Sequence, residues 1–551
     1  MLYKSLFAGF YIPSKIKRYA HFAWGLRSFF RHRISIEQAR AVVAQRLINR
    51  EDNFLRLVER GIFGYRKSPY LPLLKQAACE MSDIQDLVRT RGLESTLLAL
   101  REAGVYVTFE EFKGREPMIR NGKIIPIQVR DFDNPYLRSY YEATSGGTTG
   151  MAVRIPISLD HTIAQNYPIL LAYDAHSVLD LPIAIWYGIL PDSTGVENIL
   201  RGSLFGNVPR KWFSPVVTRD LKASLVDHLG NLGTYYIILM GRLMNLHIPF
   251  PEYVSLDHAA VVTHWAADIL KTHGQCLIRA NVSMAMRVCI AAQEEGLDLT
   301  GVTLMGGGEP PTPAKVTEIT RTGARWVPNY WFTEAGVVGW GCAKPVDPND
   351  IHIFKDAIAL IQYPRHLNGL KTPVDAFYYT TLLPTAPKLL LNVESDDYGL
   401  IEKRSCGCPL ETYGYTEHLR HIRSFRKITG EGVTLVGSEM IRILEEVLPA
   451  RFGGSPFDYQ LLEEEDEKGF TKVSLLVSPR VGTVNEKKVI ETVLEAIGES
   501  TLSVGARALW SQARTLQIKR MEPVWTSRGK LMPLHLSQLS KSPTADKVTD
   551  H

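Results

Sequence analysis

The chain lacks any apolar stretch long enough to cross a bilayer. Residues 6–12 are apolar, but Pro13 and a basic cluster follow them at once. A transmembrane helix needs about 20 apolar residues, so we expect neither a membrane span nor a cleavable signal. The 6 cysteines are too few and too unevenly spaced for a disulfide framework in 551 residues. These absences favour a cytoplasmic protein.

The chain also lacks a strong charge of either sign. A formal net charge of +5 is small for this length, whereas a dedicated nucleic-acid-binding protein carries a dense basic face. We therefore expect no nucleic-acid partner, and the slight positive excess favours anionic substrates. With 45% hydrophobic residues the composition is globular, and the length requires about two to four domains.

The first 36 residues contain no acidic side chain, yet they carry seven lysines and arginines among many aromatic residues. Such a basic, aromatic and helical segment has three interpretations. It lies on an anionic membrane surface, which would make the protein membrane-peripheral, it faces a hydrophobic partner, or it packs on the body of the protein itself.

The middle of the chain alternates between strand-like and helical patterns. Strands are predicted at 105–109, 124–127, 183–186 and 235–238, and helices at 258–272 and 283–295. This alternation favours a layered α/β sheet.

From residue 424 the composition shifts to a basic cluster followed by two glycines, which indicates a hinge. We therefore divide the chain into a basic aromatic helical extension (1–60), a large α/β domain (61–423) and a small, mobile α+β lid with a disordered tail (424–551).

A stretch rich in glycine and hydroxyl groups follows Thr144. Glycines let the backbone turn with positive φ and approach a ligand closely, and hydroxyls and amides can converge on an anion. No lysine follows Gly150, which excludes a P-loop of the nucleotide triphosphatases. The stretch is either a phosphate-binding loop or a flexible turn. Its candidate ligands are Ser145, Gly146, Gly147, Thr148, Thr149 and Gly150.

Three later segments also carry candidate ligands. An apolar strand at 303–305 ends in Gly-Gly-Gly-Glu-Pro (306–310), which exposes bare backbone where α/β sheets bind ligands. Glu334 stands in an aromatic-rich stretch, where burying it unpaired would be costly. A Mg²⁺ ion on phosphate oxygens would neutralise it, and so would an arginine or a helix N-terminus. Asp396 and Asp397 follow a row of leucines and could accept hydrogen bonds from the vicinal hydroxyls of a ribose.

Together these segments resemble, in order and approximate spacing, the motifs of the acyl-adenylate-forming superfamily. The phosphate loop [ST]-S-G-[ST]-T-G carries one extra glycine here, G-G-E-P is matched at 307–310, and Y-G-x-T-E at 330–334 has Trp331 in place of its glycine. T-G-D corresponds to Asp397 or, one residue earlier, Asp396, and the closing G-K to 529–530. The resemblance spans residues 60 to 535 and is greatest to the phenylacetate–CoA ligase and capsule-biosynthesis ligase branch.

The resemblance implies roles for individual residues. Gly308, Glu309, Pro310 and Tyr330 would hold the adenosine, and Asp397 the ribose. Thr333 and Glu334 would act at the phosphates, Glu334 through Mg²⁺, and Lys530 would lie between the attacking carboxylate and the phosphate. The family's hinge motif G-R-x-x-D is missing, so no hinge residue is assigned.

The implied activity is ATP-dependent activation of an aromatic or hydrophobic carboxylic acid as an acyl adenylate. The acyl group would then pass to CoA, or alternatively to the phosphopantetheine of a carrier protein or to an amine. A homodimer is compatible with the resemblance. The competing hypothesis from another class is a catalytically silent, membrane-associated scaffold.

Four residues form a second constellation: Cys342, His352, Cys406 and Cys408. A C-x-C pair offers two thiolates from one tight turn, and Cys342 with His352 would complete a tetrahedral set. The irregular spacing leaves free cysteines as the alternative. Some members of the branch are similar here and carry a structural zinc ion, which the resemblance therefore implies.

Overall fold

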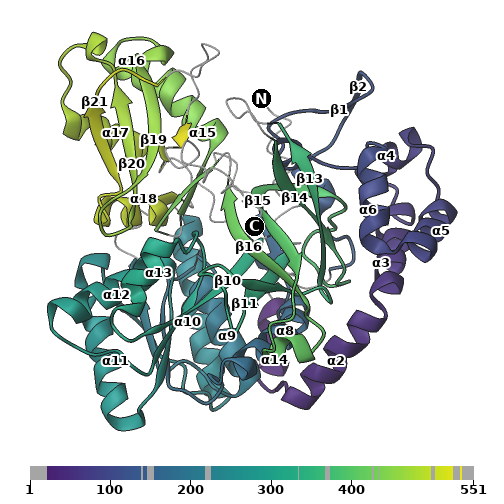
Figure 1. The fold of residues 1–551 in the computed structure, drawn as a ribbon, viewed down its shortest axis with the longest axis horizontal. Coiled ribbons are helices and arrows are strands. Elements are labelled where there is room, and N and C mark those ends of the chain that lie inside the picture. The colour runs from purple at the N-terminus through teal and green to yellow at the C-terminus, as the bar shows by residue number, and fades with distance from the viewer. Residues whose placement is uncertain are drawn as a thin grey trace, which may run out of the picture.

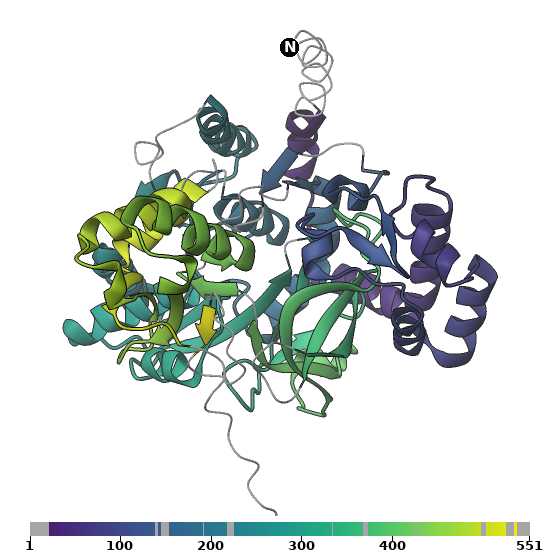
Figure 2. The same cartoon turned by 90° about the horizontal axis from the view of Figure 1, so that it is seen from above.

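The structure is a computed structural model of the chain (Figures 1 and 2). It describes residues 21–137, 141–144, 154–190, 192–216, 225–332, 334–366, 373–424, 427–431, 433–497, 503–524 and 534–536.

A 12-stranded sheet forms the centre of the large domain, in the order β13-β14-β15-β16-β12-β11-β10-β9-β8-β5-β6-β7 (Figure 1). One half is parallel and comprises β5 (Ile183–Trp186), β6 (Lys211–Ser214), β7 (Pro251–Tyr253), β8 (Cys276–Arg279), β9 (Val302–Gly306) and β10 (Arg325–Phe332). The other half is antiparallel and comprises β11 (Gly336–Gly341), β12 (Ile351–Ile353), β13 (Ile358–Arg365), β14 (Val374–Thr381), β15 (Val393–Lys403) and β16 (Glu417–Ser424).

Helices cover both faces of the parallel half, because its strands bury alternate side chains on opposite sides. Ile183 and Ile185 pack with α8 (Leu159–Ala175), α9 (Thr194–Phe205) and α10 (Leu225–Leu243). Ala184 and Trp186 pack with α11 (Ala260–His273) and α12 (Val282–Glu294). The helix α13 (Pro313–Thr320) lies beside α12. The predicted layered α/β fold is confirmed.

The antiparallel half is covered by helices from the start of the chain. These are α3 (Arg50–Val58), α4 (Leu71–Gln76), α5 (Met81–Arg91), α6 (Leu93–Glu102) and α7 (Phe109–Phe112), whereas α2 (Ile36–Ile48), which precedes them, packs against α8. Phe54, Leu97 and Phe112 bury their side chains in one cluster with Phe377 and Tyr379 of β14. Two hairpins, β1 (Met118–Arg120) with β2 (Lys123–Ile125) and β3 (Tyr141–Thr144) with β4 (Arg154–Ile157), follow.

The C-terminal part has its own sheet and its own core (Figure 1). Its four strands run in the order β21 (Leu516–Arg520), β20 (Thr471–Val477), β19 (Tyr459–Glu465), β22 (Leu534–Leu536). The helices α15 (Gly437–Arg442), α16 (Leu448–Phe452), α17 (Glu486–Ile497) and α18 (Ser503–Gln512) accompany them, after a hairpin of β17 (Lys427–Gly430) and β18 (Val433–Val436).

Two predicted strands are wrong. Residues 235–238 lie inside α10: Tyr235 and Tyr236 are 39% and 41% exposed, while Ile237 and Ile238 are 4% and 1% exposed. Two adjacent exposed residues followed by two adjacent buried residues fit the period of a helix, whereas a strand would alternate residue by residue. Tertiary packing therefore overrides the β propensity of these residues. At 105–109 only Val107 forms a bridge, and Thr108 caps α7 by accepting from the Glu111 amide.

The described part of the N-terminal extension packs on the body of the protein. Residues 21–29 are helical, and Phe22, Leu26, Phe29 and Phe30 join the core cluster of α8 and α10. Trp24, on the outer side, is 82% exposed. Among the described residues, the structure holds no helix with the length and hydrophobicity of a membrane span. Contact of the extension with a membrane surface stays a prediction, because residues 1–20 lie outside the described part.

This packing predicts that Leu26→Ala lowers the free energy of unfolding by about 2–5 kcal/mol, since it leaves a cavity at a side chain that is fully buried. Trp24→Ala, two residues away on the same helix, should change stability little. Thermal unfolding of both variants checks this. Equal midpoints for the two would mean that the helix does not pack on the large domain.

Candidate functional site

The predicted adenine segment lies at the carboxyl end of β9, between β8 and β10. A Cβ atom on Gly306 would lie 1.7 Å from the carbonyl oxygen of Ala280, and one on Gly307 would lie 2.4 Å from that of Asn329. The neighbouring backbones therefore require both glycines. Gly308 has a φ of +85°, which glycine adopts without strain. The segment is thus held in a narrow slot at the edge of the sheet where parallel strands present ligand sites.

The carboxylate of Glu309 is occupied by the protein itself. Its oxygens accept from the amide and the hydroxyl of Ser283 at the start of α12, both at 2.8 Å, and from Lys315 Nζ at 3.2 Å. Lys315 Nζ also donates to Thr471 Oγ1 of the C-terminal sheet at 3.2 Å. We therefore assign Glu309 to holding this segment in place. Of the three residues predicted to bind the adenosine, Gly308 and Pro310 can then contact a ligand through their backbone.

Tyr330 and Asp397, both predicted nucleotide ligands, meet across 67 positions of sequence. The Tyr330 hydroxyl donates to Asp397 Oδ2 at 2.7 Å, and Ser424 Oγ donates to Oδ1 at 2.6 Å. Burial and the negative charge of Asp397 hold the pKa of Tyr330 well above its usual range, so the phenol keeps its proton. The binding of ribose hydroxyls by Asp397 stays a prediction. Asp396, also fully buried, has a positive φ of 65°.

Glu334 is buried just before β11 and forms an ion pair with Lys113 Nζ. Burial raises the pKa of Glu334, but the Lys113 ammonium more than offsets this, and the pKa is lowered overall. The pKa of Lys113 is also lowered, because burial outweighs the attraction of Glu334. A second buried lysine, Lys388, adds positive charge nearby. The expected partner of Glu334 was a metal ion, an arginine or a helix N-terminus; the structure shows a lysine.

Sequence reasoning missed Lys113, and no local signal marks it. It caps the C-terminus of the four-residue helix α7, 221 positions before Glu334, where a solvated lysine is the ordinary expectation.

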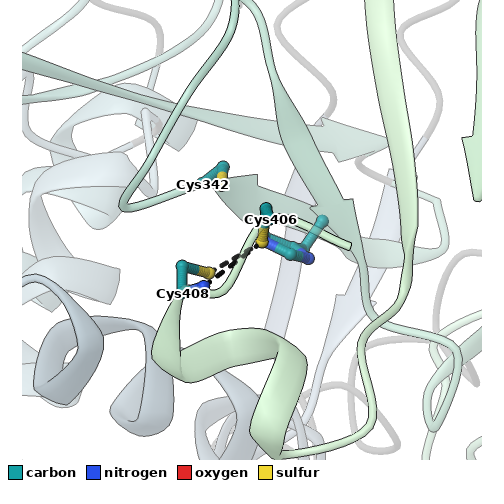
Figure 3. A group of neighbouring side chains, drawn as sticks. Cys342, Cys406 and Cys408 are labelled. Atoms are coloured by element: carbon teal, nitrogen blue, oxygen red, sulfur yellow. Dashed lines mark hydrogen bonds between the residues drawn. The ribbon is translucent and has the colours of Figure 1, made fainter. Parts of the chain in front are cut away.

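The predicted metal ligands come together (Figure 3). Cys342 directly follows β11, His352 lies in β12, and Cys406 and Cys408 precede the short helix α14 (Pro409–Thr412). Their ligand atoms all lie within 4.8 Å of one another, and His352 Nε2 is 3.1 Å from Cys408 Sγ and 3.6 Å from Cys406 Sγ. Three sulfurs and one imidazole form a set that can hold a tetrahedral metal ion.

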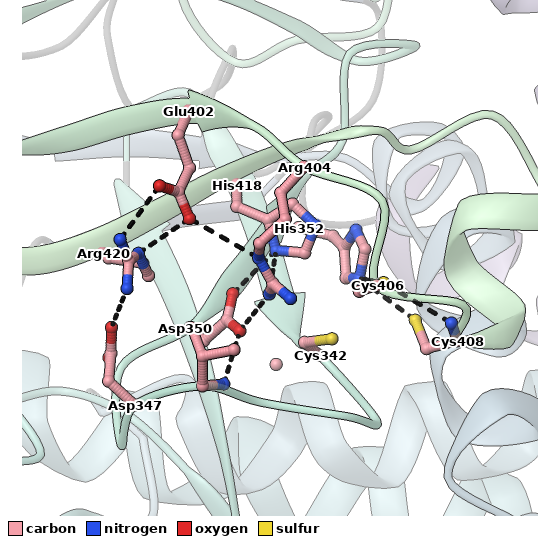
Figure 4. A network of polar contacts seen from close by, with 12 residues as sticks. Cys342, Asp347, Asp350, His352, Glu402, Arg404, Cys406, Cys408, His418 and Arg420 are labelled. Carbon is pink, nitrogen blue, oxygen red and sulfur yellow. Dashed lines mark hydrogen bonds and ion pairs between the residues drawn. The ribbon is translucent and has the colours of Figure 1, made fainter.

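The surroundings prepare these side chains for a metal. His352 Nδ1 lies 2.7 Å from the carbonyl oxygen of Tyr415, which can only accept, so Nδ1 carries the proton and Nε2 turns its lone pair to the sulfurs. Hydrogen bonding from the Cys342 thiol lowers the pKa of Cys408. Figure 4 shows the adjoining network, in which Asp350 Oδ1 lies 2.7 Å from His418 Nδ1 and the carboxylate also pairs with Arg404.

Several predicted site residues lie outside the described part of the chain: Ser145, Gly146, Gly147, Thr148, Thr149, Gly150, Thr333 and Lys530. Thr144 of β3 pairs with Arg154 of β4, so the predicted phosphate loop connects the two strands of a hairpin.

No protein-family model and no curated protein matches the chain. Solved structures do. A 2-hydroxyisobutyryl-CoA ligase, determined with 2-HIB-AMP and CoA in its thioesterification state, matches with a TM-score of 0.53 at 13% identity, over 92% of this chain and 93% of that chain. The same enzyme in its postadenylation state reaches 0.42 at 12% identity, over 92% and 90%. An amide bond synthetase from Marinactinospora thermotolerans reaches 0.38 at 13% identity, over 90% and 92%. The first match establishes that this chain has the fold of that ligase.

The Lys113–Glu334 pair predicts strong coupling between the two residues. Lys113→Met alone should destabilise the protein by about 3–5 kcal/mol, because it leaves the buried carboxylate uncompensated. Combining it with Glu334→Gln should recover a large part of that loss, as a double-mutant cycle in chemical denaturation would measure. The matched control is the exposed pair Lys271–Asp268, 2.9 Å apart, for which the cycle should give no resolvable coupling. Additive effects at 113 and 334 would contradict the ion pair.

Proposed function

We propose that this protein is an ATP-dependent enzyme that activates a carboxylic acid as an acyl adenylate and then transfers the acyl group to a thiol. The observation that carries the proposal is the contact of Tyr330 with Asp397, beside the glycine slot at the carboxyl end of β9. Two groups expected to hold a nucleoside meet there although they are remote in sequence. The matching 2-hydroxyisobutyryl-CoA ligase, which was solved with an acyl adenylate and CoA, supports the same reaction class.

The reaction has two displacements. A carboxylate oxygen of the acid attacks the α-phosphorus of ATP, and the bond to the β-phosphate oxygen breaks, so that pyrophosphate leaves. A thiolate then attacks the acyl carbon, and AMP departs with the bridging oxygen. Catalysis here is positioning and charge neutralisation, and it needs no protein nucleophile.

The chain supplies the contacts for these steps. Asp397 and Tyr330 orient the ribose, and the backbone at Gly308 lies against the adenine. Hydroxyls and amides of 145–150 donate to the β- and γ-phosphates, and Thr333 donates close to the reacting phosphate. Lys530 places its ammonium between the attacking carboxylate and the α-phosphate, where negative charge gathers as pyrophosphate leaves.

Glu334 offers the oxygen ligand that Mg²⁺ prefers. A Mg²⁺ ion bound there would neutralise phosphate charge. In the described conformation Lys113 already neutralises Glu334. Glu334 would hold a Mg²⁺ ion, which would supply positive charge to the phosphates together with the Lys113 ammonium. We propose CoA as the thiol acceptor, since the matching ligase binds CoA; a carrier-protein phosphopantetheine is the alternative, and a labelled acceptor panel separates the two.

The assignment of Lys530 predicts a split between the two half-reactions. Lys530→Ala should reduce acid-dependent pyrophosphate release by about 100-fold or more, because one charge that is preorganised for the departing phosphate is lost. Thioester formation from a supplied acyl adenylate should persist. Lys541→Ala, which removes a lysine of the same C-terminal segment, is the control. Wild-type pyrophosphate release by the Lys530 variant would refute its role.

We further propose that Cys342, His352, Cys406 and Cys408 hold a structural zinc ion. The donor set fits, because thiolates and a neutral imidazole are the ligands zinc prefers and the His352 tautomer is already set by Tyr415. The ion would cross-link β11, β12 and the turn before α14.

This proposal predicts about one zinc per chain in protein purified without chelators, retained through dialysis. Cys408→Ser should lower the zinc content and the thermal midpoint together, whereas Cys79→Ser, at a half-buried cysteine outside the group, should change neither. Elemental analysis provides the test. A folded wild-type protein without any bound transition metal would rule the proposal out.

A further inference from the structure

Two arginines are buried between α9 and the parallel strands. Arg201, on α9, and Arg279, the last residue of β8, are each 3% exposed. Both line one cavity of about 10 Å³, which is room for one water molecule. Arginine is among the residue types least often buried unless it is paired.

The neighbours of both guanidinium groups are uncharged. Arg201 Nε donates to Asn166 Oδ1 at 3.0 Å, and one Nη donates to Asn198 Oδ1 at 3.1 Å. With the Asn329 amide oriented to accept, its oxygen lies 3.2 and 3.3 Å from the two Nη atoms of Arg279. Arg279 also stacks on Trp340, with 5.0 Å between its central carbon and the ring centroid. Its Nε has no hydrogen-bond partner among the described residues.

Two buried positive charges therefore face one carboxylate among the described residues, that of Glu197, and Arg201 also interacts with the Tyr173 hydroxyl. Within the described ranges, neither arginine forms an ion pair with a carboxylate. Glu197 attracts Arg201 from a distance, but its carboxylate accepts from Ser193 Oγ at 2.7 Å. Burial lowers the pKa of Arg201, and the charge of Arg279 lowers it further. Since arginine keeps its proton in proteins, this arrangement costs several kcal/mol unless an anion compensates it.

The arginines adjoin the predicted nucleotide site on the other side of β10. Trp331 turns its ring to Arg201, 5.5 Å from the guanidinium carbon, while the preceding Tyr330 reaches Asp397. The Tyr187 hydroxyl lies 3.4 Å from where a Cβ of Gly306 would be. Burial raises the pKa of Tyr187, and the positive charges of Arg279 and Arg201 oppose that rise, so both lie near its hydroxyl.

We infer that Arg201 and Arg279 form the receptor for a second carboxylate on the acid that this enzyme activates, so that its substrates are dicarboxylic acids. This rests on the proposed function. The reacting carboxylate faces the α-phosphate at the glycine slot, and the distal carboxylate enters between the two guanidinium groups. The cavity has room for one water molecule, and one oxygen of the distal carboxylate would occupy that volume. The side chains that line the cavity would shift to make room for the other carboxylate atoms. This replaces the aromatic or hydrophobic acid expected from sequence.

The test uses acid-dependent exchange of pyrophosphate into ATP by the full chain. Dicarboxylic acids of three to eight carbons are compared with monocarboxylic acids of equal length. For the wild type, kcat/KM should favour the best dicarboxylate by about 100-fold or more, because an acid without the second charge leaves both guanidinium groups buried and unpaired. Arg279→Met should lose most of that preference, so that the ratio of its kcat/KM values for dicarboxylates and monocarboxylates falls toward one. Arg325→Met is the control, since Arg325 donates to the His176 carbonyl and Thr303 Oγ1, away from the cavity.

A binding measurement separates failure of this inference from failure of the proposed function. At constant ionic strength and without nucleotide, dicarboxylates should raise the thermal midpoint of the wild type and not that of Arg279→Met. If the Arg279→Met variant does not fold, Arg279→Lys replaces it in both measurements, because lysine keeps the positive charge but loses the paired N–H donors of the guanidinium group. Stabilisation without exchange would support the receptor and refute the adenylating function. Equal exchange with both acid classes, or equal stabilisation by chloride or phosphate, would overturn the inference.

Discussion

The ion pair between Lys113 and Glu334 joins the short helix α7 to the centre of the large sheet. It is one example of the constraint that governs the predicted nucleotide site. Charged groups are buried there and must be neutralised locally. Glu309 pairs with Lys315 and accepts from Ser283, and Asp397 accepts from the hydroxyls of Tyr330 and Ser424. Every one of these carboxylates therefore has a defined position, which is the preorganisation that the proposed adenylation would require. The two buried arginines donate to uncharged amides, and this local excess of positive charge is the basis of the proposed substrate class.

The same contacts connect the edge of the sheet to the C-terminal part. Lys315 links Glu309 to Thr471 of β20, and Gln512 of α18 accepts from the Leu256 amide and donates to the Pro215 carbonyl. Each is a single hydrogen bond, with a net contribution of about 1 kcal/mol. Phe470 and Ala513 are also buried in the core cluster of α11 and α12, and Arg287 pairs with Glu431 at 2.6 Å. The rotation of the C-terminal part that we propose between two half-reactions would have to break this packing as well as the hydrogen bonds.

Much of the fold could be predicted from sequence, because long apolar patterns and strand-ending glycines act locally. The strand 183–186 is found as predicted, and 303–305 forms the middle of β9. The segment 235–238 was assigned wrongly because four apolar or aromatic residues in a row fit either period. The C-x-C pair indicated part of the metal-ligand group, but the irregular spacing left free cysteines as the alternative, because the members are brought together by two strands and a distant turn. The resemblance added the zinc ion. Lys113, Arg201 and Arg279 could not be predicted, because their importance lies in burial and in partners from remote elements.

The most direct test of the account follows the oxygen atoms. The protein is incubated with ATP, Mg²⁺, CoA and the acid that best supports pyrophosphate exchange, with its carboxylate oxygens labelled with ¹⁸O, and the products are measured by mass spectrometry. If an acyl adenylate forms, AMP retains one labelled oxygen, because the thiol breaks the bond between that oxygen and the acyl carbon. Label in inorganic phosphate together with ADP, or AMP without label, would contradict the account.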